Sequence, residues 1–311
     1  MDTNSMIKTV IVIIPAFNEG EIIGRTVTAV KSQQEAFAIR GMNMLVYVIN
    51  DGSQDQTQKS AEEAGADRVI SHRRNQGLGA AIRTGLKSAR ADGAHIVIKF
   101  DADLQHEPKD LLPLIQPILD NEADVVYGSR FDRIEYRMPP IRRLGNLVFT
   151  GLMRWLTKWP IRDSQPGILA VNGYYLKNFY LPGDYNYTQQ ILIDAYRKGM
   201  RFAHVSVTFR QRLTGRSFIS FKYPFKVLPQ IFMVLISVRP LKVFAPIGFS
   251  FLGVGSFLFI WEIWQWYQGI YTKPIQHANL VLGLVLFGIQ TLFFGVLAHL
   301  IVETKERDSH E

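Results

Sequence analysis

Two long stretches without a charged side chain limit most strongly what this chain can fold into. No Asp, Glu, Lys or Arg occurs from Val243 to Trp261 or from Ala278 to Val302. An α-helix needs about 20 apolar residues to cross a bilayer core about 30 Å thick. A pair of buried core helices is the alternative. However, two such runs joined by a short loop that starts among Trp and Tyr side chains are more typical of a membrane hairpin.

Basic residues predict how this hairpin is oriented. Six of them flank the outer ends of the two runs: Lys222, Lys226, Arg239, Lys242, Lys305 and Arg307. The connecting loop offers only Lys273, so the positive-inside rule places both ends in the cytoplasm. No signal peptide is evident, because the first apolar run, Val10 to Ile14, is short and ends at Pro15. We therefore predict a two-span, multi-pass protein of the cell membrane with a cytoplasmic catalytic domain. The hairpin also offers a surface for homo-oligomer formation.

The residues before the hairpin predict an α/β domain. Strands are expected at residues 9–14, 44–49, 68–71, 96–100 and 125–127, and helices at residues 21–40, 56–64 and 78–90. This alternation predicts a mainly parallel sheet with helices on both faces, whose ligands bind beyond the carboxyl ends of the strands. The basic, proline-containing residues 131–166 are expected to form an irregular, mobile segment beside the site.

Polar clusters follow three of the expected strands, at residues 15–19, 50–53 and 101–103. Asp101 and Asp103 alternate along an extended chain, so their carboxylates can converge on Mg²⁺ or Mn²⁺, with Gln105 continuing the alternation. A cation held by so few protein groups takes its other ligands from a substrate diphosphate and water. We therefore expect the two acids to be left unpaired until that cation arrives.

Other ligand classes fit less well. The glycines of residues 77–82 resemble a dinucleotide fingerprint, but Ile82 replaces the third glycine and four residues separate the expected strand from Gly77. The absence of cysteine excludes disulfides, zinc-thiolate sites and a Cys nucleophile. The net charge of +8 favours an anionic partner, and the adjacent apolar runs favour a lipid or phosphorylated substrate over nucleic acid.

Short motifs in a fixed order resemble the inverting glycosyltransferases of family 2. They lie at residues 15–19, 50–53, 75–81, 101–108, 128–130, 163–167 and 212–217. The last three narrow the resemblance to the polyprenyl-phosphate glycosyltransferases, a group that includes dolichyl-phosphate mannose synthases. The resemblance implies a GT-A catalytic domain, Rossmann-like with a mainly parallel sheet, over residues 1–216. Interfacial helices over residues 217–242 and two transmembrane helices within residues 243–311 would follow.

The resemblance also implies residue roles. The nucleoside and diphosphate would contact Pro15, Ala16, Asn18, Glu19, Asp51, Gly79 and Ala102. Within that set, Asp51 would lie near the base and Glu19 near the ribose. The metal ligands would be Asp101, Asp103 and Gln105. The lipid phosphate would be received by Arg130 and by one or both of Arg142 and Arg143, and the donor diphosphate by Arg212.

Three positions depart from the group's pattern. Phe218 stands where the group commonly has a lysine, so Arg216 or Lys222 would have to replace it. His204 occupies a position that often holds an acid, and we expect it to be a structural histidine. Residues 189–190 are both glutamine, where Glu is frequent. Because of these departures, the sugar that members of the group transfer is a weaker guide to the sugar that this chain transfers.

The predicted activity is metal-dependent, inverting transfer of a sugar from GDP-mannose or a UDP-sugar to dolichyl or undecaprenyl phosphate. The ionised acceptor phosphate is itself the nucleophile, so no strong general base is required. A processive polysaccharide synthase is the enzymatic alternative, but its Gln-x-x-Arg-Trp motif is absent. A non-catalytic nucleotide-sugar-binding membrane protein is the other alternative, and the presence of Asp101 and Asp103 argues against it.

Overall fold

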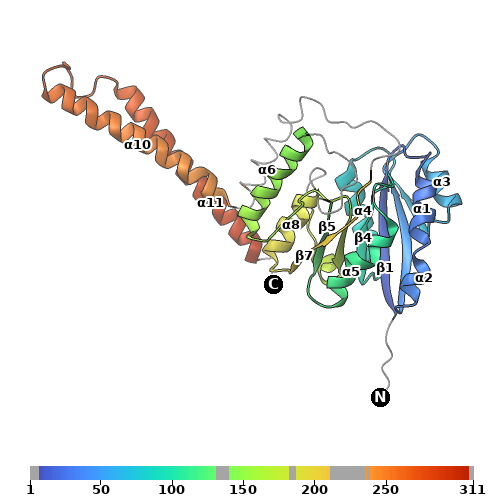
Figure 1. Ribbon diagram of the computed structural model, residues 1–311. Coiled ribbons are helices and arrows are strands. Elements are labelled where there is room, and N and C mark those ends of the chain that lie inside the picture. The colour runs from blue at the N-terminus through green and yellow to red at the C-terminus, as the bar shows by residue number, and fades with distance from the viewer. Residues whose placement is uncertain (1–6, 131–139, 182–186, 211–235, 237–238, 308–311) are drawn as a thin grey trace. The chain divides into compact units, whose positions relative to one another are not determined.

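The computed structural model describes residues 7–130, 140–181, 187–210, 236 and 239–307. The chain divides into two compact units, residues 1–218 and 219–311 (Figure 1). The first unit is built on a seven-stranded sheet in the order β3-β2-β1-β4-β6-β5-β7. Its strands are β1 (Lys8–Ala16), β2 (Met42–Asn50), β3 (Arg68–Ser71), β4 (Ile96–Lys99), β5 (Val125–Ser129), β6 (Leu169–Asn172) and β7 (Phe202–Ser206). Only β6 runs antiparallel to its neighbours, β4 and β5.

Helices separate these strands along the chain. They are α1 (Ile23–Lys31), α2 (Gln34–Ala38), α3 (Thr57–Glu63), α4 (Leu78–Ala91), α5 (Leu111–Leu119), α6 (Pro140–Thr157), α7 (Gly173–Asn178) and α8 (Tyr187–Arg197), with a short 3-10 turn, η1 (Pro108–Asp110), before α5. The predicted mainly parallel α/β fold is therefore confirmed. One expected helix, residues 21–40, is in fact two short helices, α1 and α2.

Strand β1 lies at the centre of the core because both of its faces are covered. Val10, Val12 and Ile14 pack in the apolar cluster that α1, α2 and α5 complete. On the other face, Gly85 of α4 lies so close to Ile13 that an added Cβ would be 3.0 Å from its Cδ1. Burial on both faces explains the continuous β-branched run of this strand.

Helix α6 corrects one prediction. Residues 131–166 were expected to be irregular, yet Pro140–Thr157 form an α-helix that starts with proline, which is favoured in a first turn. Its side chains Phe149, Met153 and Leu156 are buried at helical spacing. Residues 131–139 lie outside the described part of the chain.

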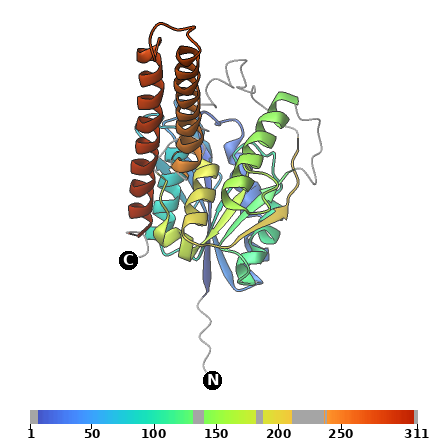
Figure 2. The same cartoon turned by 90° about the vertical axis from the view of Figure 1, so that its left-hand side faces the viewer.

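The described part of the second unit contains two long antiparallel helices, α10 (Pro240–Tyr267) and α11 (Ala278–Arg307), which run side by side (Figure 2). At 28 residues, α10 is about 42 Å long, enough to cross a membrane. In the most apolar part of each helix only 11% and 22% of the residues are buried, so neither resembles the core helix of a soluble protein. Most of the predicted interfacial segment, residues 217–242, lies outside the described part of the chain.

Glycines bring the two helices into close contact. A Cβ added to Gly288 would lie 2.9 Å from the Gly248 carbonyl oxygen, and one added to Gly248 would lie 2.6 Å from Leu292 Cγ. Small residues at such positions let helix backbones approach in a membrane. At the loop end of the pair, Glu262 accepts hydrogen bonds from the His277 ring at 2.7 Å and from its backbone N–H at 3.1 Å.

Candidate functional site

The loops that follow β1 and β2 hold each other through hydrogen bonds. The backbone N–H of Asn18 donates to Ser53 Oγ at 2.9 Å, and that of Gln54 donates to Asn18 Oδ1 at 3.0 Å. The backbone N–H of Glu19 donates to Thr57 Oγ1 at 2.9 Å. The structure thus brings together the two polar loops predicted to contact the nucleoside, at the carboxyl edge of the parallel strands.

Asp51 fastens a third loop to this pair. Its buried carboxylate accepts hydrogen bonds from the backbone N–H of Gln76 at 2.9 Å and of Gly77 at 2.8 Å, and from His72 Nδ1 at 2.7 Å. The next residue, Gly52, has φ +73°, and a Cβ there would lie 2.4 Å from the Arg74 carbonyl carbon. Asp51 therefore positions the loop that leads into α4 and Gly79, while its predicted contact with a base remains a prediction.

The acid at the end of β4 already has a partner, contrary to expectation. Lys99 is 1% exposed, and its ammonium forms an ion pair with Asp101 Oδ1. The same nitrogen donates to the Gly167 carbonyl oxygen at 2.7 Å and lies 5.5 Å from the centre of the Tyr187 ring. Burial alone would lower the pKa of Lys99, but the Asp101 carboxylate outweighs it and raises that pKa. The prediction that both acids lack a protein partner was wrong, since a lysine inside a strand was not expected to turn toward the site.

The chain does not stay extended through the predicted metal ligands. Strand β4 ends at Lys99, Ala102 and Asp103 lie in a turn, and Leu104 has φ +54°. Asp103 Oδ1 accepts the backbone N–H of Gln105 at 3.1 Å. The amide nitrogen of Gln105 donates to the Arg210 carbonyl at 3.0 Å, which leaves its amide oxygen as the atom to face a cation. The expectation that the backbone stays extended from Asp101 to Asp103 was therefore wrong.

The residues around Asp101 nonetheless fit a divalent cation. Gly167 lets the second carboxylate oxygen and the histidine ring pack directly against its backbone, because a Cβ there would lie 2.5 Å from Asp101 Oδ2 and 2.3 Å from His106 Nε2. Both ring nitrogens of buried His106 lack a hydrogen-bond partner of ordinary geometry among the described residues. Those residues contain no group of three or more His, Asp or Glu side chains that could hold a metal ion. Such an ion would therefore take its remaining ligands from Gln105, a bound diphosphate and water.

The neighbouring histidine is kept neutral. Burial is the largest cause and lowers the pKa of His106 to about 4, although the Asp101 carboxylate acts in the opposite direction. The ring packs between Phe100 and Phe209, with centroids 6.3 Å and 5.0 Å away. A neutral imidazole beside Asp101 adds no charge to the site, so it does not repel a cation there.

Arg130, predicted to receive the lipid phosphate, is held inside the protein. It follows β5, is 6% exposed, and binds Asp163 through Nε at 2.7 Å and Nη2 at 3.1 Å. Asn146 of α6 also donates to Asp163, at 2.8 Å. Burial tends to raise the pKa of Asp163, but Arg130 and these hydrogen bonds outweigh it and hold the pKa below its ordinary value. This pair joins α6 to the end of β5, a link that sequence reasoning missed because the two residues are distant in the chain.

The other predicted phosphate ligands fall in different places. Arg143 is exposed on the first turns of α6. Arg142 belongs to the same helix, but its side chain lies outside the described residues, as do Arg212, Arg216, Phe218 and Lys222. His204 is structural as expected, since Nε2 accepts the backbone N–H of Arg162 at 2.8 Å and Nδ1 lies 3.3 Å from the Tyr127 carbonyl oxygen.

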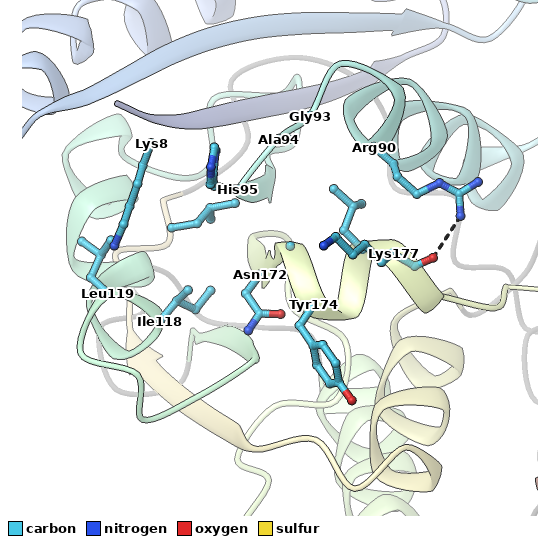
Figure 3. Close-up of a pocket in the computed structure, with 13 residues that line it drawn as sticks. Lys8, Arg90, Gly93, Ala94, His95, Ile118, Leu119, Asn172, Tyr174 and Lys177 are labelled. Carbon is cyan, nitrogen blue, oxygen red and sulfur yellow. Dashed lines mark hydrogen bonds between the residues drawn. The ribbon is translucent and has the colours of Figure 1, made fainter. Parts of the chain in front are cut away.

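A cavity of about 520 Å³ lies at the opposite edge of the sheet (Figure 3). It is lined from the start of β1 by Lys8, from the start of β4 by His95, and from α7 by Lys177, whose ammonium points into it (Figure 3). None of its lining residues belongs to the predicted site. The candidate site is therefore defined by the loops at the carboxyl ends of the strands and not by this cavity.

Comparison with known proteins finds matches to both parts of the chain. Residues 11–170 match the family described as glycosyl transferase family 2, and residues 239–303 match the GtrB C-terminal hairpin. A UDP-N-acetylglucosamine–dolichyl-phosphate N-acetylglucosaminyltransferase of Methanococcus voltae is 32% identical, over 55% of this chain and 72% of its own length. A dodecaprenyl-phosphate galacturonate synthase of Rhizobium johnstonii is 24% identical over 95% of this chain and 88% of its own length.

A solved structure shares the fold of the first unit. Glucosyl-3-phosphoglycerate synthase from Mycobacterium tuberculosis, in complex with Mg²⁺ and uridine diphosphate, matches with a TM-score of 0.58 and 23% identity. The match covers 74% of this chain and 79% of that one. The predicted GT-A-like fold is thereby confirmed.

Proposed function

The chain belongs to glycosyl transferase family 2, and on this basis we propose that it moves a sugar from a nucleoside diphosphate to a polyprenyl phosphate at a membrane surface. That it is a glycosyltransferase follows from its family and from relatives named for transfer to dolichyl and dodecaprenyl phosphate. The choice of donor, metal, acceptor and membrane side is our proposal. The observation that carries it is the Asp101 carboxylate at the carboxyl end of β4, at the edge of the sheet where the β1 and β2 loops also meet.

The proposed binding of the nucleotide-sugar donor is based on the loops that follow β1 and β2. Asn18, Glu19 and the loop anchored by Asp51 would hold the nucleoside, and we favour a uridine nucleotide. The support for uridine is a relative whose name specifies a UDP-sugar and a fold neighbour solved with UDP. Mg²⁺ or Mn²⁺ held by Asp101, Asp103 and Gln105 would stabilise the negative charge that develops on the leaving diphosphate. Arg212 would add to this effect as a second cation.

The acceptor side depends on α6 and the hairpin. The buried Arg130–Asp163 pair fixes α6 against the end of β5, and exposed Arg143 on that helix would bind the acceptor phosphate as a bidentate donor. Arg130 would then act mainly by holding this helix in place. The two apolar helices would keep the enzyme at the bilayer that contains the lipid, with the catalytic unit in the cytoplasm.

The direct test is transfer by the purified full-length protein. Incubation with Mn²⁺, a panel of labelled UDP- and GDP-sugars and a polyprenyl phosphate should give a glycolipid from one donor, with inverted configuration at the anomeric carbon. Arg143→Ala should raise the KM for the acceptor at least about tenfold with little change in the KM for the donor. Surface residue Arg40, which is exposed and outside the site, supplies the control Arg40→Ala. A polymer, or nucleotide binding without turnover, would contradict the proposal.

A further inference from the structure

Lys99 is a buried cation that the proposed reaction does not use. It lies on β4 at the bottom of the candidate site, and 2% of its side chain is exposed. Its ammonium contacts the Asp101 carboxylate, the Gly167 carbonyl oxygen at 2.7 Å and the Tyr187 ring. Lysine is almost never fully buried unless it is paired, so the position of this side chain depends on Asp101.

The pairing affects a residue that the proposed metal site needs. Asp101 Oδ1 is engaged by the ammonium, and Oδ2 lies against Gly167, where an added Cβ would be only 2.5 Å away. The side chain of Asp101 is 31% exposed, so the carboxylate is still reached by solvent. A divalent cation that approaches this carboxylate meets a fixed positive charge on its other oxygen, and the two cations repel each other.

We propose that Lys99 is the internal counter-ion of Asp101, and that it makes binding of the divalent cation depend on the arrival of the donor diphosphate. This inference rests on the proposed function. Without a nucleotide, Lys99 neutralises Asp101 and disfavours a second cation there. With a nucleotide, the negative charges of the diphosphate offset the repulsion, so metal and donor bind together. Because binding linkage is reciprocal, the metal then strengthens donor binding by the same factor.

Lys99 is a positioning residue. Its removal should change the affinities for Mn²⁺ and for UDP in opposite directions. Lys99→Met keeps the length and apolar stem but removes the charge. Without nucleotide, Mn²⁺ should bind the variant about tenfold or more tightly than it binds the wild type. Without metal, UDP should bind the variant at least about threefold more weakly, because Asp101 is then an uncompensated anion near the diphosphate.

Both constants are measured on the full-length protein in detergent. Electron paramagnetic resonance of free Mn²⁺ gives the metal affinity, and calorimetry with UDP, or with GDP if UDP does not bind, gives the nucleotide affinity. Lys99→Arg, which keeps the charge, is the matched control and should behave like the wild type in both measurements. If Lys99→Met does not fold, Lys99→Gln tests the same loss of charge and keeps a donor for the Gly167 carbonyl.

If Lys99 had a merely structural role, its replacement would lower the affinities for both Mn²⁺ and UDP. That result, or no change in either affinity, would overturn the inference. The two hypotheses fail separately. If the wild type binds neither UDP nor GDP, the proposed donor is wrong, while the Mn²⁺ measurement still tests the counter-ion.

Discussion

Asp103 and Asp101 are separated by one residue but have different surroundings. Asp101 is paired with Lys99, whereas Asp103 is partly exposed and accepts the backbone N–H of Gln105. Asp103 is therefore the better residue with which to test the metal site, because its loss leaves no buried lysine unpaired.

Replacement of Asp103 should remove turnover and spare the fold. Asp103→Ala should lower kcat at least about a hundredfold, since the developing charge on the leaving group loses a stabilising ligand. The melting temperature should change little, because the partly buried hydrogen bond that Asp103 accepts contributes about 1 kcal/mol. Asp103→Asn keeps the acceptor for Gln105 and removes only the charge, so it should be equally inactive. Activity within tenfold of the wild type in Asp103→Asn would disprove the metal assignment.

The Arg130–Asp163 pair predicts a pH dependence of stability. The pKa of Asp163 is lowered in the folded state, so its contribution is present above the ordinary carboxyl value of 3.8 and is lost as the pH falls through the folded pKa. Thermal melting in detergent should therefore show a loss of stability below about pH 4. Asp163→Asn should weaken this dependence. If Asp163→Asn lost stability at low pH as the wild type does, other carboxylates would be responsible for that loss.

The same pair limits what an alanine substitution can show. Arg130→Ala leaves Asp163 buried without its cation, which typically costs about 3–5 kcal/mol. A loss of activity in Arg130→Ala could therefore result from unfolding, from displacement of α6 or from a lost phosphate contact, and the assay would not separate these causes. Arg143, which is exposed, gives the cleaner test of acceptor binding.

At the scale of the elements, Gly52 controls how closely the β2 loop packs on the loop before α4. Gly52→Ala places a Cβ against the Arg74 backbone at a positive φ, so the two loops must separate. We expect a stability loss of about 1–3 kcal/mol and a weaker affinity for the nucleotide, measured by calorimetry. Gly93→Ala is the control, because Gly93 also has a positive φ, +70°, but its Cβ would meet nothing within 4 Å. Equal nucleotide affinities in the two variants would contradict a role for the loop contact in binding.

The elements differ in how far they could be predicted from the sequence. Strands β1, β2 and β4 each contain a continuous apolar run because they are buried on both faces, so their positions were predictable. Helix α6 was missed because the prolines and basic residues of the segment 131–166 suggested an irregular structure, although buried Phe149 and Met153 have helical spacing. Strand β6 is only four residues long, and its antiparallel pairing depends on distant partners.

The meeting of the polar loops was predictable from the sequence, whereas their side-chain contacts were not. Acids and turn residues follow β1, β2 and β4, and the parallel fold brings those strand ends to one edge of the sheet. The partner of Asp101 was not predictable, because an isolated lysine at a strand end is normally solvated. Its burial depends on Gly167 and Tyr187, which approach from more than sixty residues away in the chain.

For the whole molecule, the proposed orientation can be measured directly because the chain has no cysteine. The variant Lys273→Cys, whose single cysteine lies in the loop between α10 and α11, should react with a membrane-impermeant maleimide added to intact cells. A cysteine at exposed Arg40 of the catalytic unit should react only after permeabilisation. The opposite pattern would place the catalytic unit outside the cell and refute the cytoplasmic assignment.

The close contact at Gly248 and Gly288 has a consequence for the hairpin itself. A Cβ added to Gly288 would lie 2.9 Å from the Gly248 carbonyl oxygen, so at this point the two helices meet backbone to backbone. Any larger residue at either position would have to push α10 and α11 apart, so the spacing of the hairpin depends on these two glycines.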